Sequence, residues 1–372
     1  MLRRLARLGL STLLVTVLFG APTIETGEID GAKFAIARTD KWNGGVVLLA
    51  HGFRAEGRPL VADLFPQHLA YKTLLDEGWM IAKTSYRRNG IIVRDAITDL
   101  DALRHHIATR FGAPLRVLLE GESMGGLIVT LMAEREPLGV KLYHGAVAIG
   151  AALDVREPNA TVGLTLQPRL PVLFLTNQSE LQGPRSYVTN ELQREAEVAP
   201  VVFRIARDGH VNVNQAERLA ALRALNTWID RGRSALPGGG SPGAFHDATV
   251  TPAPQPSQVK LHEDRRGFDA QVIEVSAVYG NVFINAQPAD FAAAGMDRMT
   301  WVQLAVNGLK FRVLHGRDFA SAKRTEWVTF ANADGFYWLA RNYADAAATA
   351  KLKVGDTVTL RRFDQAEPTP NR

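Results

Sequence analysis

Short apolar runs alternate with helical patterns between residues 33 and 233. In the segments that follow these runs, apolar residues recur every three or four positions, as at Leu219, Leu222 and Leu225. This spacing is typical of amphipathic helices. The runs themselves are Gly45–Ala50, Met80–Thr84, Arg116–Glu120, Gly145–Ile149, Val172–Thr176 and Val201–Ile205. This alternation predicts an α/β fold in which a mostly parallel sheet has helices on both faces.

A stretch rich in Gly and Pro ends this pattern. Residues 236–258 have no apolar period and are predicted to be a linker. Beyond it, short alternating segments and turn pairs such as Asn307-Gly308 indicate hairpins and a mainly β domain. We therefore expect an α/β domain at 22–235 and a β-barrel-like domain at 259–372, and a chain of 372 residues is long enough for both.

The first 21 residues resemble an export signal. Three arginines among the first seven positions precede an apolar stretch, Leu8–Ala21, which has the length of a signal-peptide core and is short for a membrane span. We expect a secreted or periplasmic protein with no membrane contact beyond this leader. A retained membrane anchor is the alternative, since Leu18 or Phe19 occupies a position where cleavage prefers a small residue.

Composition excludes several kinds of site. The chain has no Cys, so it has no disulfide, thiolate nucleophile or Cys-ligated zinc. The formal charge is +5, but three of the basic residues lie in the leader and no later basic run is interleaved with aromatics, so we predict no nucleic-acid partner. No metal or cofactor is expected.

The segment 121–126, Gly-Glu-Ser-Met-Gly-Gly, follows an apolar run and precedes an apolar helical pattern. A G-x-S-x-G turn between a strand and a helix exposes the serine hydroxyl beside a helix N-terminus. We predict that Ser123 is a nucleophile; the alternative is a structural turn serine.

A serine nucleophile needs a base, and the base needs an acid that orients it. His210 follows the last apolar run of the domain and is the predicted base. Glu180 follows the preceding run and is the predicted acid, with Asp154 as the alternative. We expect the backbone amides of Met124 and Phe53 to bind the oxyanion that forms on the substrate.

Three further residues lie near the ends of the predicted strands and have polar side chains that could serve the site. His51 is interpreted as stabilising the turn before Phe53 rather than as a second base. Arg87 or Arg88 could hold a substrate carboxylate, since both follow the run Met80–Thr84; the alternative is a solvated or structurally paired arginine.

Residues 30–233 resemble the α/β-hydrolase fold proteins of the serine esterase and lipase type. The His-Gly turn at 51–52, the elbow at 121–126 and the order serine, acid, histidine carry the resemblance. It implies the triad Ser123, Glu180 and His210, with one departure, since Asp is commoner than Glu at the acid position. Serine at the nucleophile argues against the dehalogenase and epoxide-hydrolase branches. The segment 154–169 is too short for a helical cap, so we expect an open site unless the second domain covers it.

Residues 259–362 resemble the C-terminal β-barrel domain of the S-adenosylmethionine hydroxide adenosyltransferase and fluorinase superfamily. The segments 278–285, 332–335, 340–342 and 354–358 carry this resemblance. It implies part of an adenosine pocket near Tyr279, Asn281 and Asn332 and a role in trimer formation. Ala333 replaces the usual serine, and the family's N-terminal catalytic domain is missing, so adenosyl chemistry is not expected.

Together these features predict an exported serine hydrolase that cleaves carboxylic esters through an acyl-enzyme. Its open site would suit small, bulky or polymeric esters. The alternatives are an amidase or peptidase with the same triad, and an inactive binding protein whose specificity lies in the C-terminal domain. That domain could also drive homo-oligomerisation.

Overall fold

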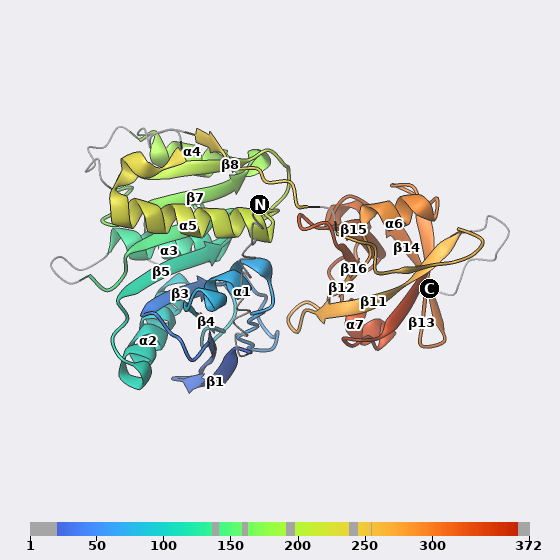
Figure 1. Ribbon diagram of the computed structural model, residues 1–372, viewed down its shortest axis with the longest axis horizontal. Coiled ribbons are helices and arrows are strands. Elements are labelled where there is room, and N and C mark those ends of the chain that lie inside the picture. The colour runs from blue at the N-terminus through green and yellow to red at the C-terminus, as the bar shows by residue number, and fades with distance from the viewer. Residues whose placement is uncertain are drawn as a thin grey trace, which may run out of the picture.

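The computed structural model describes residues 21–135, 141–157, 163–190, 198–237, 245–253 and 255–363. These residues form two sheets, which lie at opposite ends of the molecule in Figure 1. The predicted leader falls outside the described residues, apart from Ala21. No helix in the described part of the chain has the length and apolar character needed to cross a membrane.

The first sheet has nine strands in the order β1-β2-β4-β3-β5-β6-β7-β8-β9. The pairings from β4 through β9 are parallel, and β1 and β2 add an antiparallel edge. The strands are β1 (Thr23–Ile29), β2 (Ala32–Arg38), β3 (Gly45–Ala50), β4 (Met80–Thr84), β5 (Arg116–Glu122), β6 (Gly145–Ile149), β7 (Val172–Asn177), β8 (Val201–Ile205) and β9 (Phe245–Asp247).

Helices cover both faces of this sheet. They are α1 (Leu69–Asp76), α2 (Val93–Phe111), α3 (Met124–Glu134), α4 (Gln182–Val188) and α5 (Gln215–Arg231), with short 3₁₀ turns η1 (Gln178–Glu180) and η3 (Arg233–Ala235). Along β3, Val46 and Leu48 pack in one core with α2 and α3, while Val47 and Leu49 pack in the other with α1 and α5. Burial on both faces explains why the central strands are continuous apolar runs. The predicted α/β fold, a mostly parallel sheet with helices on both faces, is confirmed.

The second sheet is a closed barrel. Its order is β10-β11-β12-β16-β15-β14-β13-β17, and β11 also pairs with β17, which closes the ring. The elements are β10 (Lys260–Leu261), β11 (Gly267–Val275), β12 (Val282–Ile284), α6 (Pro288–Ala293), β13 (Trp301–Val306), β14 (Leu309–His315), η5 (Phe319–Ser321), β15 (Trp327–Ala331), β16 (Tyr337–Arg341), α7 (Ala346–Ala350) and β17 (Thr357–Arg362).

The predicted hairpin of the second domain is present. Asn307 and Gly308 join β13 to β14 with φ of 51° and 74°. Two positive φ values match a hairpin turn whose twist follows that of the strands. Asn and Gly occupy these positions because they adopt this conformation at the lowest cost.

The structure differs from the linker prediction at one point. Within the stretch 236–258, β9 pairs with β8 and extends the first sheet. Beyond β9, the Val250 backbone bonds to two residues at the start of α5: its amide donates to Glu217 and its carbonyl accepts from the Asn214 side chain, at 2.9 and 2.7 Å. Residues 245–250 therefore dock on the α/β domain before the chain enters the barrel. This docking depends on tertiary contacts, which a local composition rich in Gly and Pro does not indicate.

The barrel lies at the carboxyl ends of the parallel strands. In Figure 1 the arrowheads of β5 and β7 point toward it. Hydrogen bonds of 2.7–2.8 Å connect Tyr279, Glu274 and Asp334 of the barrel to Phe53, His68 and Gln215 of the α/β domain, respectively. Phe53 and His68 follow β3, and Gln215 follows β8, so the barrel contacts the edge at which this fold carries its chemistry.

Candidate active site

The backbone at Ser123 forms a sharp turn between β5 and α3. Ser123 has φ 56° and ψ −119°, a conformation that is costly for a residue with a side chain. A Cβ at Gly121 would lie 2.1 Å from the Gly125 carbonyl oxygen, and one at Gly125 would lie 2.0 Å from that of Ala50. The glycines are therefore required, because only they allow strand and helix to approach closely enough to expose the serine.

Three side chains meet at this turn. The imidazole of His210 lies with Nε2 2.8 Å from Ser123 Oγ, and its Nδ1 bonds to Glu180. Ser123 follows β5, Glu180 ends the 3₁₀ turn after β7, and His210 follows β8. Because these strands are parallel, their carboxyl ends deliver the three groups to one edge of the sheet.

Of the two candidate acids, Glu180 is the one that is hydrogen-bonded to His210. The Asp154 side chain is exposed in a turn after β6, and His210 Nδ1 is bonded to Glu180. The hydrogen bond to Glu180 raises the pKa of His210 above its ordinary value, against the opposing effect of desolvation. A carboxylate in this position favours the imidazolium that a base forms when it accepts a proton.

The predicted oxyanion donors lie on both sides of Ser123. Met124 is the first residue of α3, where backbone amides have no intrahelical acceptor. A Cβ on Gly52 would lie 3.0 Å from Ser123 Cβ, so the loop that carries Phe53 contacts the serine. Within the described residues, the amides of Phe53 and Met124 donate to no protein acceptor. Both are free to bind an oxygen that develops negative charge.

His51 lies under this loop. Its Nδ1 is 2.7 Å from the Gly52 carbonyl oxygen and its Nε2 is 3.0 Å from that of Ser85. Burial, together with the charges of Arg54 and Lys83, lowers the pKa of His51 to about 3. The side chain is therefore neutral at ordinary pH and has a single N–H. With the proton on Nδ1 it donates to the Gly52 carbonyl oxygen and holds the turn before Phe53, in agreement with the structural interpretation.

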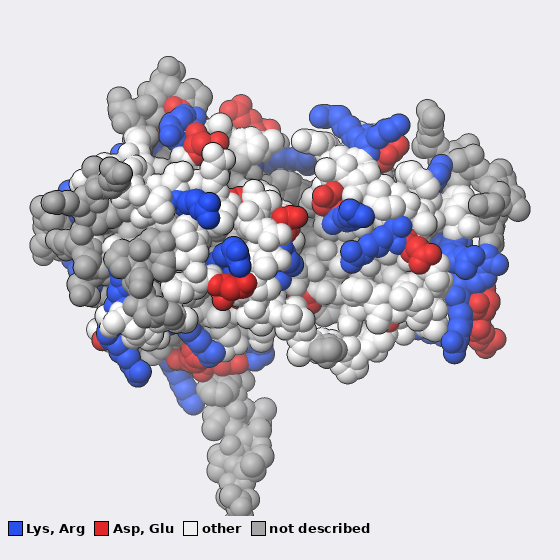
Figure 2. Space-filling model, turned by 90° about the horizontal axis from the view of Figure 1, so that it is seen from above, with Lys and Arg blue, Asp and Glu red and all other residues white. Residues whose placement is uncertain are grey.

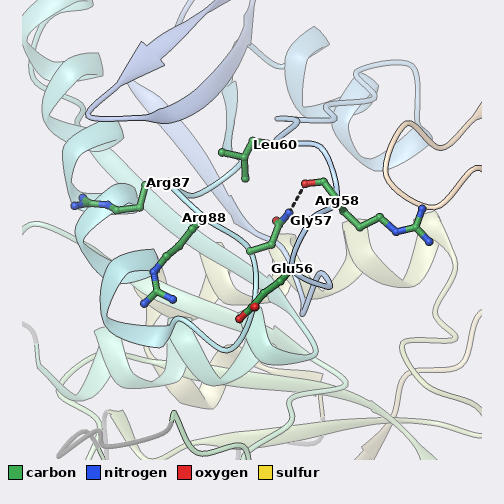
Figure 3. Close-up of a pocket in the computed structure, with 7 residues that line it drawn as sticks. Glu56, Gly57, Arg58, Leu60, Arg87 and Arg88 are labelled. Atoms are coloured by element: carbon green, nitrogen blue, oxygen red, sulfur yellow. Dashed lines mark hydrogen bonds between the residues drawn. The ribbon is translucent and has the colours of Figure 1, made fainter.

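The structure pairs both candidate substrate-binding arginines with carboxylates. Arg87 forms hydrogen bonds to Asp99 at 2.5 and 2.8 Å, and Arg88 bonds to Asp95 at 2.6 Å. Both residues line a cavity of about 320 Å³, shown in Figure 3. Its other lining residues are Glu56, Gly57, Arg58, Leu60 and Asn89. Because both guanidinium groups are paired with carboxylates of the protein, a structural role for these arginines is favoured over binding of a substrate carboxylate.

A buried charge network beneath the elbow was missed from the sequence. Arg218 of α5 bonds to Glu120 and Glu122 of β5, and Tyr71 donates to Glu120 at 2.8 Å. Burial raises the pKa of Glu120, while Arg218 opposes that rise. A Glu in an otherwise apolar strand was the available signal, because a buried carboxylate needs a cationic partner. The network ties β5, which carries Ser123, to α1 and α5.

No group of His, Asp and Glu residues within the described ranges is arranged to hold a metal ion.

On the face shown in Figure 2, acidic and basic side chains both occur on each domain.

One known family matches part of the second domain. Residues 270–359 match the family of SAM hydroxide adenosyltransferase C-terminal domains, which confirms the resemblance of the barrel. No curated protein matches the chain.

The solved structures that are similar to this chain each cover part of it. An uncharacterized conserved protein from Thermotoga maritima is 24% identical, with a TM-score of 0.24, over 25% of this chain and 35% of its own length. The Pyrococcus furiosus esterase Pf2001 is 14% identical, with a TM-score of 0.40, over 60% of this chain and 98% of its own. A hyperthermophilic esterase from Pyrobaculum calidifontis is 14% identical, with a TM-score of 0.38, over 57% and 85%.

Proposed function

We propose that this protein is an exported serine hydrolase that cleaves carboxylic esters through an acyl-enzyme. The observation that supports this most strongly is the hydrogen-bonded series of Ser123, His210 and Glu180 on a strained strand-to-helix turn. A hydroxyl in contact with an oriented imidazole is the arrangement that nucleophilic catalysis by serine requires.

In the first half of the reaction, Ser123 Oγ attacks the ester carbonyl carbon and its proton moves to His210 Nε2. The carbonyl π electrons move to the oxygen, which the Phe53 and Met124 amides stabilise. The tetrahedral intermediate then collapses: the bond to the alcohol oxygen breaks, and His210 gives its proton to the leaving alcohol. Glu180 stays ionised and stabilises the imidazolium while it exists.

In the second half, water attacks the acyl carbon while His210 Nε2 accepts a proton from it. The bond between the acyl carbon and Ser123 Oγ then breaks, and His210 returns the proton to the serine. The products are a carboxylic acid and an alcohol, and the three side chains regain their initial state.

The exposure of the site supports a broad substrate range. The His210 side chain is 56% exposed, and no described residue between β6 and β7 belongs to a helix that could form a cap. A bulky or polymeric ester could therefore reach the serine from solvent. Export rests on the sequence of the leader alone.

The first test is hydrolysis of p-nitrophenyl esters of increasing acyl length by the full chain. Ser123→Ala should abolish the activity, and Ser321→Ala, on the 3₁₀ turn of the barrel, should retain it. Circular dichroism would establish that each variant folds. A fluorophosphonate should label the wild type and the Ser321 variant but not the Ser123 variant. Labelling without ester hydrolysis would favour an amidase or peptidase, and no labelling of folded protein would favour a binding protein.

A further inference from the structure

The loop that carries Phe53 is held at two successive carbonyl groups. The Gly52 carbonyl oxygen lies 2.7 Å from His51 Nδ1, and the Phe53 carbonyl oxygen accepts a hydrogen bond of 2.8 Å from the Tyr279 hydroxyl. The first contact comes from the α/β domain and the second from the barrel. Because peptide units are planar, fixing these two oxygens fixes the peptides on both sides of the Phe53 Cα and hence the direction of its amide.

Tyr279 projects from a tightly bonded turn between β11 and β12. The turn is held by hydrogen bonds from the Gly280 amide to Ser276 and from the Ala347 amide to Gly280, at 2.8 and 2.9 Å. Gly280 has φ 69°, and a Cβ there would lie 1.9 Å from Asp345. This close packing leaves little freedom to the backbone that carries the tyrosine. Its hydroxyl is thus presented to the Phe53 loop from a rigid support.

A second barrel residue contacts the other side of the site. Asp334 accepts a hydrogen bond of 2.8 Å from the backbone amide of Gln215, the first residue of α5. His210 lies on the loop that leads into this helix. The barrel thus contacts the loop of the predicted oxyanion donor and also the helix that follows the predicted base. Both contacts come from the segments that carry the resemblance to the adenosyltransferase family.

We infer that Tyr279 is a positioning residue of the oxyanion hole, so that the barrel completes the active site of the hydrolase domain. This inference rests on the proposed function. When Ser123 attacks, the carbonyl oxygen of the ester gains negative charge and needs the Phe53 N–H in a fixed direction. Tyr279 acts on this step through the Phe53 carbonyl and does not touch the substrate.

The test is Tyr279→Phe in the full chain, which removes only the hydroxyl. The matched control is Glu274→Ala, which removes another hydrogen bond between barrel and α/β domain, that to His68 at 2.7 Å. Loss of an entire oxyanion donor reduces kcat by about 10²–10³. A donor that is present but less well oriented should cost less, and we expect about a tenfold fall in kcat for Tyr279→Phe. KM should stay within about twofold, because the ester binds before the oxyanion forms.

A boronic acid inhibitor supplies a second measurement, because its adduct with serine carries the tetrahedral oxyanion geometry. Its affinity should fall with Tyr279→Phe by about the same factor as kcat, whereas Glu274→Ala should change neither quantity. Wild-type kcat in a folded Tyr279→Phe variant would overturn the inference and leave the proposed function intact. Equal losses in both variants would also overturn it, since they would reflect domain docking in general. A wild type that neither hydrolyses esters nor reacts with fluorophosphonate would overturn the proposed function and the inference together.

Discussion

Replacing Arg218 by Met should destabilise the α/β domain through one buried carboxylate. Glu120 is 2% exposed and forms an ion pair with Arg218. Removing one member of a buried ion pair costs about 3–5 kcal/mol. Glu122, the other partner, is 41% exposed and can be solvated, so we expect the lower end of the range, about 3 kcal/mol. For a domain of this size that lowers Tm by roughly 6–12 °C.

The loss of stability in Arg218→Met should depend on pH, because it depends on whether Glu120 is protonated. Burial raises the pKa of Glu120, and loss of Arg218 raises it further, so the folded variant binds a proton more tightly than the unfolded chain does. The destabilisation is then largest above the folded pKa and shrinks as pH falls toward the ordinary carboxyl range. Adding Glu120→Gln should restore part of the stability.

Scanning calorimetry of the full chain at pH 8 and pH 5 measures these effects. The controls are the wild type and the single Glu120→Gln variant, which completes a double-mutant cycle. A loss below about 1 kcal/mol at pH 8 would refute the assignment of a buried charge to Glu120. A double variant no more stable than Arg218→Met would refute it as well.

Three further predictions follow from the site and the turns. Because Glu180 raises the pKa of His210 and the base must be neutral, Glu180→Gln should lower kcat and move the acid limb of the pH–rate profile to lower pH; an unmoved limb would contradict this role. Gly125→Ala places a Cβ 2.0 Å from the Ala50 carbonyl oxygen and should abolish esterase activity and lower Tm; a variant that matches wild type would contradict the geometry of the elbow. Gly308→Ala meets no atom within 4 Å but has φ 74°, so it should cost only about 1–2 kcal/mol in barrel unfolding, and ester hydrolysis should be unchanged.

The central strands were predictable because their burial leaves a local signal. β3, β4, β6 and β8 have the bounds expected from their apolar runs, since both faces of the sheet are covered. β1 and β2 were not predicted as strands, because β1 is largely exposed and has no apolar run. The turn between them, Asp30-Gly31 with φ of 48° and 85°, is a hairpin signal that could have identified the pair.

In the candidate site, too, residues marked by a local sequence pattern could be predicted, whereas contacts between the two domains could not. Ser123, Glu180 and His210 could be located because each follows an apolar run, and parallel strands bring such ends together. The contact of Tyr279 with Phe53 could not be predicted, because it depends on how two separately folded units dock. No periodicity or turn chemistry of either segment indicates that arrangement.

The short strand β9 has a consequence for where the chain can be divided. A protein shortened to end at Ala235 would lack β9 and leave the outer side of β8 without its partner at Val202–Arg204. An exposed strand with unsatisfied amides and carbonyls is a template for pairing with another molecule. Such a fragment would also lose Leu236, which is buried in one of the cores of the domain, and should therefore be prone to aggregation. A fragment that extends past Val250 keeps the sheet edge protected and is the better choice for isolating the α/β domain.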